Sequence, residues 1–152
     1  ALAIHVVSPE RLCLEVTESV MVENPGVVLD QLGKLRATGV QISLDDFGTG
    51  YCSLAYFRDL PVDEIKIDKS FVLNMLESEK DYAIVKAVID LAHNFSMKVV
   101  AEGVESNAIA SELGKLGCDI LQGYVFDKPL PSDEFSTQYG LQARAGNHRS
   151  HN

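Results

Sequence analysis

The sequence predicts an α/β fold of the (β/α)8 TIM-barrel type, here partial, with about five parallel strand–helix units. Three features support this prediction. Short apolar runs alternate with segments of helical periodicity, which favours right-handed βαβ units in a parallel sheet. These runs are rich in Val, Ile and Leu on both faces, which is typical of parallel strands covered by helices. Polar, mostly acidic side chains recur where the runs end, and the runs cover residues 12–18, 40–46, 64–68, 98–102 and 119–122.

The segments between the predicted strands have a helical repeat. Asn24 and Pro25 predict an N-cap followed by proline at the first helical position, and Gly39 predicts the C-terminal cap. The apolar face of this first helix would carry Val28, Leu32 and Leu35. The apolar positions of the longest predicted helix are Val85, Val88, Ile89, Ala92 and Phe95, and those of the next helix are Ile109, Leu113 and Leu116, before Gly117.

The length of the chain bears on how much of a barrel it can form. The 152 residues are enough for one domain with its own core, whereas an eight-stranded barrel typically takes about 250 residues. The first predicted strand also follows the start of the sequence almost at once. We therefore expect residues 1–138 to form the second part of a barrel that belongs to something larger. Residues 139–152 lack an apolar repeat, and we expect a disordered tail there.

Composition and charge exclude several classes of function. The formal charge of −9 and the pI near 4.8 argue against a nucleic-acid polymer as partner, because such a partner requires a basic surface. No apolar run approaches the roughly 18 residues that cross a bilayer, and no signal peptide is expected. The three cysteines are odd in number and have no metal-type spacing, which favours a reducing, cytoplasmic location.

Polar and charged side chains gather at the carboxyl ends of the predicted strands. In an α/β barrel these ends converge on one rim, where catalytic groups lie. Carboxylates on one rim repel each other unless a cation lies among them, so the pattern suggests metal-assisted chemistry. The candidate residues are Glu15, Glu18, Asp45, Asp46, Lys66, Asp68, Glu102, Glu105 and Gln122.

Asp45 and Asp46 end an apolar strand and precede a glycine-rich turn. Two interpretations are open: the pair provides ordinary turn chemistry, or it contributes to a site for two divalent ions. Neighbouring side chains on a regular strand point to opposite faces. Both acids therefore reach the rim only if the chain bends there.

Lys66 is the most informative single residue, because a strand covered on both faces should not tolerate a lysine without a partner or a function. Its ammonium either forms an ion pair that holds the barrel mouth together or lies where a phosphate or a metal-bound hydroxide would be, and the two roles are compatible.

The remaining candidates carry weaker signals. Glu102 ends its strand and favours a site role, whereas Glu105 suits a helix start and is better explained as structural. Glu18 either contacts a ligand or braces a loop, and Gln122 offers a neutral amide to a water or a ligand. We expect the histidines, among them His93, to lie at the surface or in the tail without partners.

The motifs that contain these candidates identify a family. They are Glu15–Glu18, Asp45–Tyr51, Leu60–Phe71, Val100–Glu105 and Gln122–Phe126, the last followed by Lys128–Pro131. In this order, and over nearly the whole chain, they closely resemble the EAL domain. This is the family of cyclic di-GMP phosphodiesterases of bacterial signalling.

The resemblance implies a (β/α)8-type barrel with one strand reversed, which uses Mg²⁺ or Mn²⁺ to cleave cyclic di-GMP to linear pGpG in the bacterial cytoplasm. By position, Glu15 would bind the first metal, Asp45 would bridge the pair and Asp46 would help to hold the second. Lys66 would orient the attacking water, Glu102 would serve as metal ligand or general base, and Gln122 would position water. Glu18 would brace the loop that links the metal site to a dimer interface. Asp68 and Glu105 would be supporting or structural residues.

The sequence also departs from the family pattern. It has no Glu-Ala-Leu segment, which would bring a metal-binding glutamate and a substrate-binding arginine, nor the asparagine that completes the first metal's ligands. A partial ligand set should bind metal weakly. We therefore expect weak or no activity from this chain alone; the alternative is a non-catalytic nucleotide- or protein-binding or dimerisation module. We also expect a homo-oligomer, formed through exposed barrel edges or the helix after the Asp-Asp-Phe-Gly-Thr-Gly loop.

Overall fold

A computed structural model describes residues 7–21, 24–48 and 57–140 of the chain. These residues form one five-stranded parallel sheet in the order β1-β2-β3-β4-β5, so the strands follow one another in space as they do in sequence. The prediction of five parallel strand–helix units is confirmed. The strands are β1 (Cys13–Thr17), β2 (Gln41–Phe47), β3 (Glu64–Ile67), β4 (Lys98–Ala101) and β5 (Ile120–Leu121).

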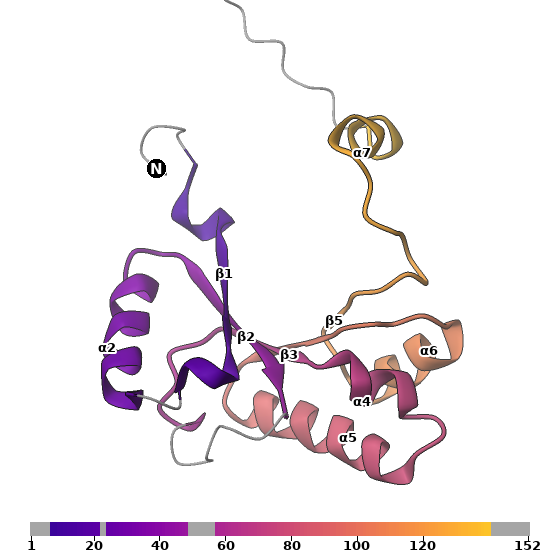
Figure 1. Ribbon diagram of the computed structural model, residues 1–152, viewed down its shortest axis with the longest axis horizontal. Helices are drawn as coiled ribbons and strands as arrows, with labels where there is room; N and C mark the ends of the chain where they lie inside the picture. Colours follow the sequence, from indigo (N-terminus) through magenta and orange to yellow (C-terminus); the bar gives the residue numbers. More distant parts are fainter. Residues whose placement is uncertain (1–6, 22–23, 49–56, 141–152) are drawn as a thin grey trace, which may run out of the picture.

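Helices connect and flank these strands (Figure 1). The 3-10 helices η1 (Pro9–Arg11) and η2 (Glu18–Met21) lie on either side of β1 in the sequence. Figure 1 shows α7 at the top of the view, away from the sheet and from the other helices. The α-helices are α2 (Pro25–Arg36), α4 (Lys69–Asn74), α5 (Glu79–Asn94), α6 (Asn107–Lys115) and α7 (Ser132–Gln138).

One face of the sheet forms the core. Ile42 and Leu44 of β2, together with Ile65 and Ile67 of β3, are fully buried and pack in one apolar cluster with residues of the helices. The helical contribution comes from Leu32 of α2, Val72 of α4, Val85, Val88, Ile89 and Ala92 of α5, and Ile109 and Leu113 of α6. Burial of this face supplies the main driving force for folding.

The opposite face of the sheet is mostly polar, so the expectation of strands that are apolar on both faces is wrong. Alternation along the strands places Glu15, Ser43 and Glu64 on this face, in register with one another. Val100 lies on it and is buried, but it does not belong to the apolar cluster. A sheet with one apolar and one polar face can hold charged side chains where a barrel interior is usually filled with Val, Ile and Leu.

The helix predictions hold with two corrections. Asn24 and Pro25 begin α2 as expected, and Gly39 and Gly117 follow their helices with φ of 92° and 84°. Leu35, however, is 41% exposed, whereas Leu32 of the same helix is 5% exposed, so the buried face of α2 does not extend to Leu35. Phe95 is 38% exposed and lies at the C-cap of α5 rather than on its buried face, although its ring contacts Phe57.

Two aspartates fasten the amino-terminal ends of the strands in the same way. Asp63, just before β3, accepts the backbone N–H of Ile42 at 3.0 Å and pairs with Arg36 in the last turn of α2 at 2.8 Å. We call these three residues the Asp63 clamp. Each clamp joins a strand, the turn before a second strand and the end of a helix, so it fixes their relative positions.

The second of these clamps repeats the arrangement between β4 and β5. Asp119, just before β5, accepts the N–H of Val99 at 2.8 Å and pairs with His93 in the last turn of α5 at 2.9 Å. We call these three residues the Asp119 clamp. His93 lies at the surface as expected, but the expectation that it has no partner is wrong. The other three histidines lie outside the described residues.

Candidate active site

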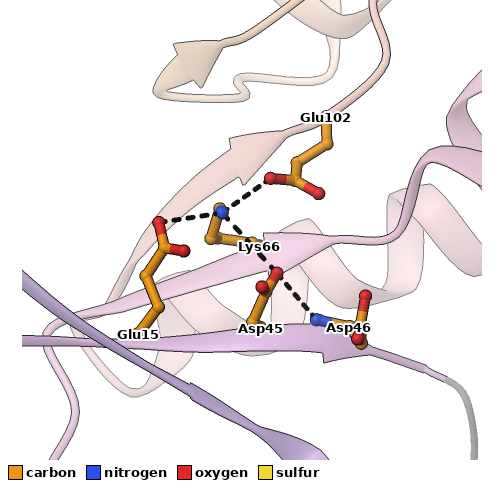
Figure 2. Close-up of polar contacts among 5 residues, drawn as sticks. All are labelled: Glu15, Asp45, Asp46, Lys66 and Glu102. Carbon is orange, nitrogen blue, oxygen red and sulfur yellow. Dashed lines mark hydrogen bonds and ion pairs between the residues drawn. The ribbon is translucent and has the colours of Figure 1, made fainter.

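Lys66 lies at the centre of a group of carboxylates near the carboxyl ends of the strands (Figure 2). Its side chain is only 7% exposed. The ammonium nitrogen is 2.6 Å from Glu102 Oε1, 2.9 Å from Glu15 Oε1 and 3.6 Å from Asp45 Oδ1. The two shorter distances are those of charge-assisted hydrogen bonds.

Each carboxylate comes from a different part of the sheet. Glu15 is on the edge strand β1, Asp45 is on β2, and Glu102 directly follows β4. Because the strands are parallel and adjacent, their carboxyl ends lie side by side, and residues distant in sequence converge here. Glu15 has a side chain that is 57% exposed, whereas those of Asp45 and Glu102 are each 22% exposed. The cluster is therefore closed at β3 and open toward the edge at β1.

The carboxylates keep Lys66 charged. Burial alone would lower the pKa of the Lys66 ammonium, but hydrogen bonds to Glu102 and Glu15, together with the charges of Glu102 and Asp45, raise it well above that of a free lysine. One positive charge lies among three carboxylates, so the group retains excess negative charge. Such a site favours an additional cation.

The chain bends at Asp45 and Asp46, as the prediction that both acids reach the rim requires. The pairing of β2 with β3 shifts register between Leu44 and Phe47, which is the mark of a β-bulge. Asp46 has φ of 56°, a left-handed conformation that is uncommon for residues other than glycine, although Asp is among those that tolerate it. Its N–H donates to Asp45 Oδ1 at 3.0 Å, which orients the Asp45 side chain toward Lys66.

The carboxylate cluster around Lys66 fits divalent ions only in part. Carboxylate oxygens are the ligands that Mg²⁺ and Mn²⁺ prefer, so the donor chemistry fits. The spacing, however, suits the ammonium: within residues 7–21, 24–48 and 57–140, no three His, Cys, Asp or Glu side chains form a group that could hold a metal ion. In this structure, Lys66 takes the central position among the acids.

A cavity of about 480 Å³ opens beside Glu102. Gly103 and Gly123 form part of its wall. Their backbones approach other chain segments closely: a Cβ on Gly123 would lie 2.2 Å from the Val104 carbonyl oxygen, and one on Gly103 would lie 2.6 Å from the Lys69 Cβ. The remaining lining residues are Lys69, Glu105, Gln122, Tyr124, Asp127, Lys128 and Pro129. The cavity combines an aromatic ring with groups of both charges.

The structure brings some of the other candidates to this region and gives others a local role. Gln122 lines the cavity, and its backbone bonds to Ala101 and Val104 hold it beside Glu102. Glu105 lines the same cavity and is exposed. Asp68 is the N-cap of α4 and accepts the N–H of Ser70. Glu18 is buried in η2, while the last two residues of the Asp-Asp-Phe-Gly-Thr-Gly loop that it would brace lie outside the described residues.

Sequence reasoning missed Tyr124 and Lys128 as candidate site residues. The Lys128 ammonium lies 5.5 Å from the centre of the Tyr124 ring, a cation–π contact, and both residues line the cavity. Their proximity in sequence to Gln122 was the available signal. Tyr124 is largely exposed, so its ring offers a surface on which a planar ligand could stack.

Comparisons with known proteins place these features in a family. A model of the EAL domain matches residues 1–129. MucR of Pseudomonas aeruginosa, a bifunctional diguanylate cyclase/cyclic di-GMP phosphodiesterase, is 44% identical over 134 residues, which are 88% of this chain and 20% of that protein. The chain spans about a fifth of the length of the curated relatives it matches.

Solved structures agree with the sequence comparison. The PaMucR phosphodiesterase in complex with c-di-GMP superposes with a TM-score of 0.85 at 43% identity, over 88% of this chain and 54% of that chain. Klebsiella pneumoniae BlrP1, solved with manganese and cyclic di-GMP, gives a TM-score of 0.77 at 31% identity, over 84% of this chain and 33% of that chain.

No helix in the described part of the chain is both long and apolar enough to span a bilayer. The match across most of the sequence and the agreement of the folds show that this chain belongs to the EAL domain family.

Proposed function

We propose that this chain supplies one side of a metal-dependent cyclic di-GMP phosphodiesterase site, and that the reaction converts cyclic di-GMP to pGpG in the bacterial cytoplasm. The observation that carries the proposal is the convergence of Glu15, Asp45 and Glu102 on Lys66 at the carboxyl ends of the strands. The cyclic di-GMP complex of the similar phosphodiesterase PaMucR supports the substrate class.

In this proposal Glu15, Asp45, Asp46 and Glu102 hold Mg²⁺ or Mn²⁺. When bound, two such ions would make water acidic enough to attack at neutral pH and would offset charge at the phosphate. Lys66, kept charged by its neighbours, orients water near the phosphate. Glu102 is also placed to accept a proton, and Gln122 positions a water from the wall of the cavity. The cavity beside Glu102 then receives part of the nucleotide, with Tyr124 available for stacking.

We further propose that the chain alone turns over cyclic di-GMP weakly or not at all. The sequence contains no Glu-Ala-Leu segment, so the ligands which that segment supplies in the family are not among these 152 residues. A second candidate function is a non-catalytic nucleotide- or protein-binding module. The observation that favours it is the ammonium of Lys66, which occupies the centre of the carboxylates.

The test combines calorimetry with product analysis. Cyclic di-GMP is titrated into the chain in the presence of Mn²⁺, and pGpG is measured by chromatography. Asp45→Ala serves as the control, because it removes the acid expected to bridge the two ions without touching the apolar face. The proposal expects nucleotide binding that Asp45→Ala weakens, with pGpG formation slow or at the control level. Nucleotide binding that Asp45→Ala leaves unchanged, without hydrolysis in either protein, supports the non-catalytic module, and the absence of nucleotide binding contradicts both.

We also propose self-association. Strands β1 and β5 are the two edges of the sheet, and unpaired strand edges are common sites of chain–chain pairing. The helix after the glycine-rich loop, the other expected contact, lies outside the described residues. Pairing along β1 would cover Glu15, the most exposed acid of the cluster.

A further inference from the structure

A groove of about 370 Å³ lies where α4, α5 and α6 meet, and it shares no lining residue with the cavity beside Glu102. Met75 and Leu76 directly follow α4 and form its apolar floor. Met75 is 2% exposed, whereas Leu76 is 48% exposed, so part of this floor is open to solvent. The other lining residues are Glu77, Glu79, Tyr82 and Glu112.

The rim of this groove is acidic. Glu77 and Glu79 are exposed, and within the described residues no ion pair involves either of them. Glu112 accepts a hydrogen bond from the Tyr82 hydroxyl at 3.1 Å and pairs with Lys115 at 2.8 Å, which fixes the wall between α5 and α6. No lysine or arginine of the described chain lines the groove. An apolar floor beside free carboxylates fits a segment that combines apolar and cationic side chains.

The sequence that follows α7 has this composition. All 22 Asp and Glu residues of the chain lie within residues 1–140, whereas residues 141–152 contain two arginines and two histidines. Leu141, Ala143 and Ala145 provide apolar side chains around Arg144. We call residues 141–152, which lie outside the described residues, the basic tail. We propose that the basic tail binds in this groove, with its apolar side chains on the floor and its arginines against Glu77 and Glu79. This inference is independent of the proposed function.

Another acidic surface lies nearer to the basic tail in the sequence, on α7. Its cavity is lined by Asp133, Glu134, Thr137 and Gln138 and has no apolar lining residue. It offers the arginines surface ion pairs, which contribute little by themselves, whereas the groove also buries apolar surface. Figure 1 shows α7 at the top of the view and α4, α5 and α6 in its lower part. The basic tail can extend over about 40 Å, and the same tail on a second copy needs no such reach.

Limited proteolysis of the full chain tests the proposal, with trypsin cleavage after Arg144 followed by mass spectrometry. Cleavage reports the fraction of chains in which the basic tail is free. We expect Glu77→Gln/Glu79→Gln to raise the cleavage rate by about threefold to tenfold, because the arginines lose two ion pairs. Leu76→Ser should raise it as well, because it removes part of the floor. The matched control is Asp133→Asn/Glu134→Gln, which removes the same two charges from α7 and should leave the rate within about twofold.

The proposal is overturned if wild type and the groove variants are cleaved at equal rates, or if the α7 control accelerates cleavage as much as they do. Circular dichroism checks that each variant is folded.

If the groove variants do not fold, the tail variant decides. Arg144→Gln/Arg149→Gln changes only residues beyond the described fold, and hydrogen exchange of residues 75–82 is compared with that of wild type. We expect exchange at least about threefold faster in the tail variant, because the groove is then uncovered. Equal exchange in the two proteins would contradict binding of the basic tail. Protection that grows with protein concentration would support the proposal and assign the bound tail to a second copy.

Discussion

Among single residues, glycines as well as charged side chains determine the shape of the site. Gly103 and Gly123 let the segment that carries Glu102 pass close to its neighbours. The Val104 N–H donates to the Gln122 carbonyl oxygen, and the Val125 N–H donates to the Val104 carbonyl oxygen. Glu102 and Gln122 thus belong to two segments that are bonded to each other through their backbones. A displacement of one segment would move both site residues.

Gly123→Ala tests this contact. The added methyl group would lie 2.2 Å from the Val104 carbonyl oxygen. We expect a loss of about 2 kcal/mol in the free energy of unfolding, because overpacking against backbone forces local shifts. Gly114→Ala is the control: it lies in α6 with no atom within 4 Å of the new Cβ, and it should stabilise the protein by roughly 0.5–1 kcal/mol. Denaturant unfolding followed by circular dichroism measures both, and a neutral Gly123→Ala would contradict the close approach.

At the scale of the elements, the two aspartate clamps make equivalent contacts at the amino-terminal ends of the strands. The Asp63 clamp fastens β2 to the start of β3, and the Asp119 clamp fastens β4 to the start of β5. Strand β5 has only two residues in the sheet, so it depends on Asp119 more than the longer strands depend on Asp63. Since Gln122 directly follows β5, the Asp119 clamp also positions a residue of the proposed site.

Asp119→Ala should destabilise the protein by roughly 1–3 kcal/mol, because the buried N–H of Val99 loses its acceptor. Asp119→Asn keeps an acceptor and should lose less. Burial raises the pKa of Asp119, but hydrogen bonds from His93 and Val99 outweigh this and lower it. The extra stability of wild type over Asp119→Asn is therefore present above the unfolded-state pKa of about 4. It should disappear as the pH falls through the lower folded-state pKa. Unfolding measured between pH 2 and pH 7 checks this, and a difference that persists at the acid end would contradict it.

At the scale of the whole molecule, the unpaired edges of the sheet are the feature that bears on self-association. The Gln41 N–H donates to the Leu12 carbonyl oxygen, so in a parallel ladder the even-numbered residues of β1 bond to β2. The N–H groups of Cys13, Glu15 and Thr17 then face the open edge. This edge adjoins the polar face of the sheet, so a strand added there would extend the surface that carries the carboxylates.

Cys13→Pro tests association through this edge, because it removes an outward N–H without removing a bond to β2. We expect wild type to form dimers or larger assemblies at tens of micromolar, and Cys13→Pro to shift toward monomer. Cys13→Ser controls for loss of the thiol and should behave as wild type, with all samples kept reduced. Light scattering gives the mass. A monomeric wild type, or equal masses for all three proteins, would contradict association through β1.

The sequence predicted the fold and most of the strand-end acids because both depend on local patterns. Alternating apolar runs locate the strands, and a parallel sheet brings their ends together whatever the details of packing. The contact between His93 and Asp119 could not be predicted from the sequence. It joins residues 26 positions apart, and it depends on where α5 ends relative to the sheet. The exposure of Leu35 likewise could not be read from the helical repeat, which places Leu35 on the same face as the buried Leu32. The central place of Lys66 was foreseen as one of two compatible roles, but its three partners required the register of four strands.

The left-handed backbone at Asp46 limits how far the stability of this protein can be raised by substitution at that position. Glycine or asparagine would adopt this left-handed conformation with less strain. Glycine, however, would remove the carboxylate, and asparagine would replace it with a neutral amide. Selection for stability and selection for the ion binding that we propose would therefore favour different residues at this position. A directed-evolution experiment that rewards heat tolerance alone should discard this acid early.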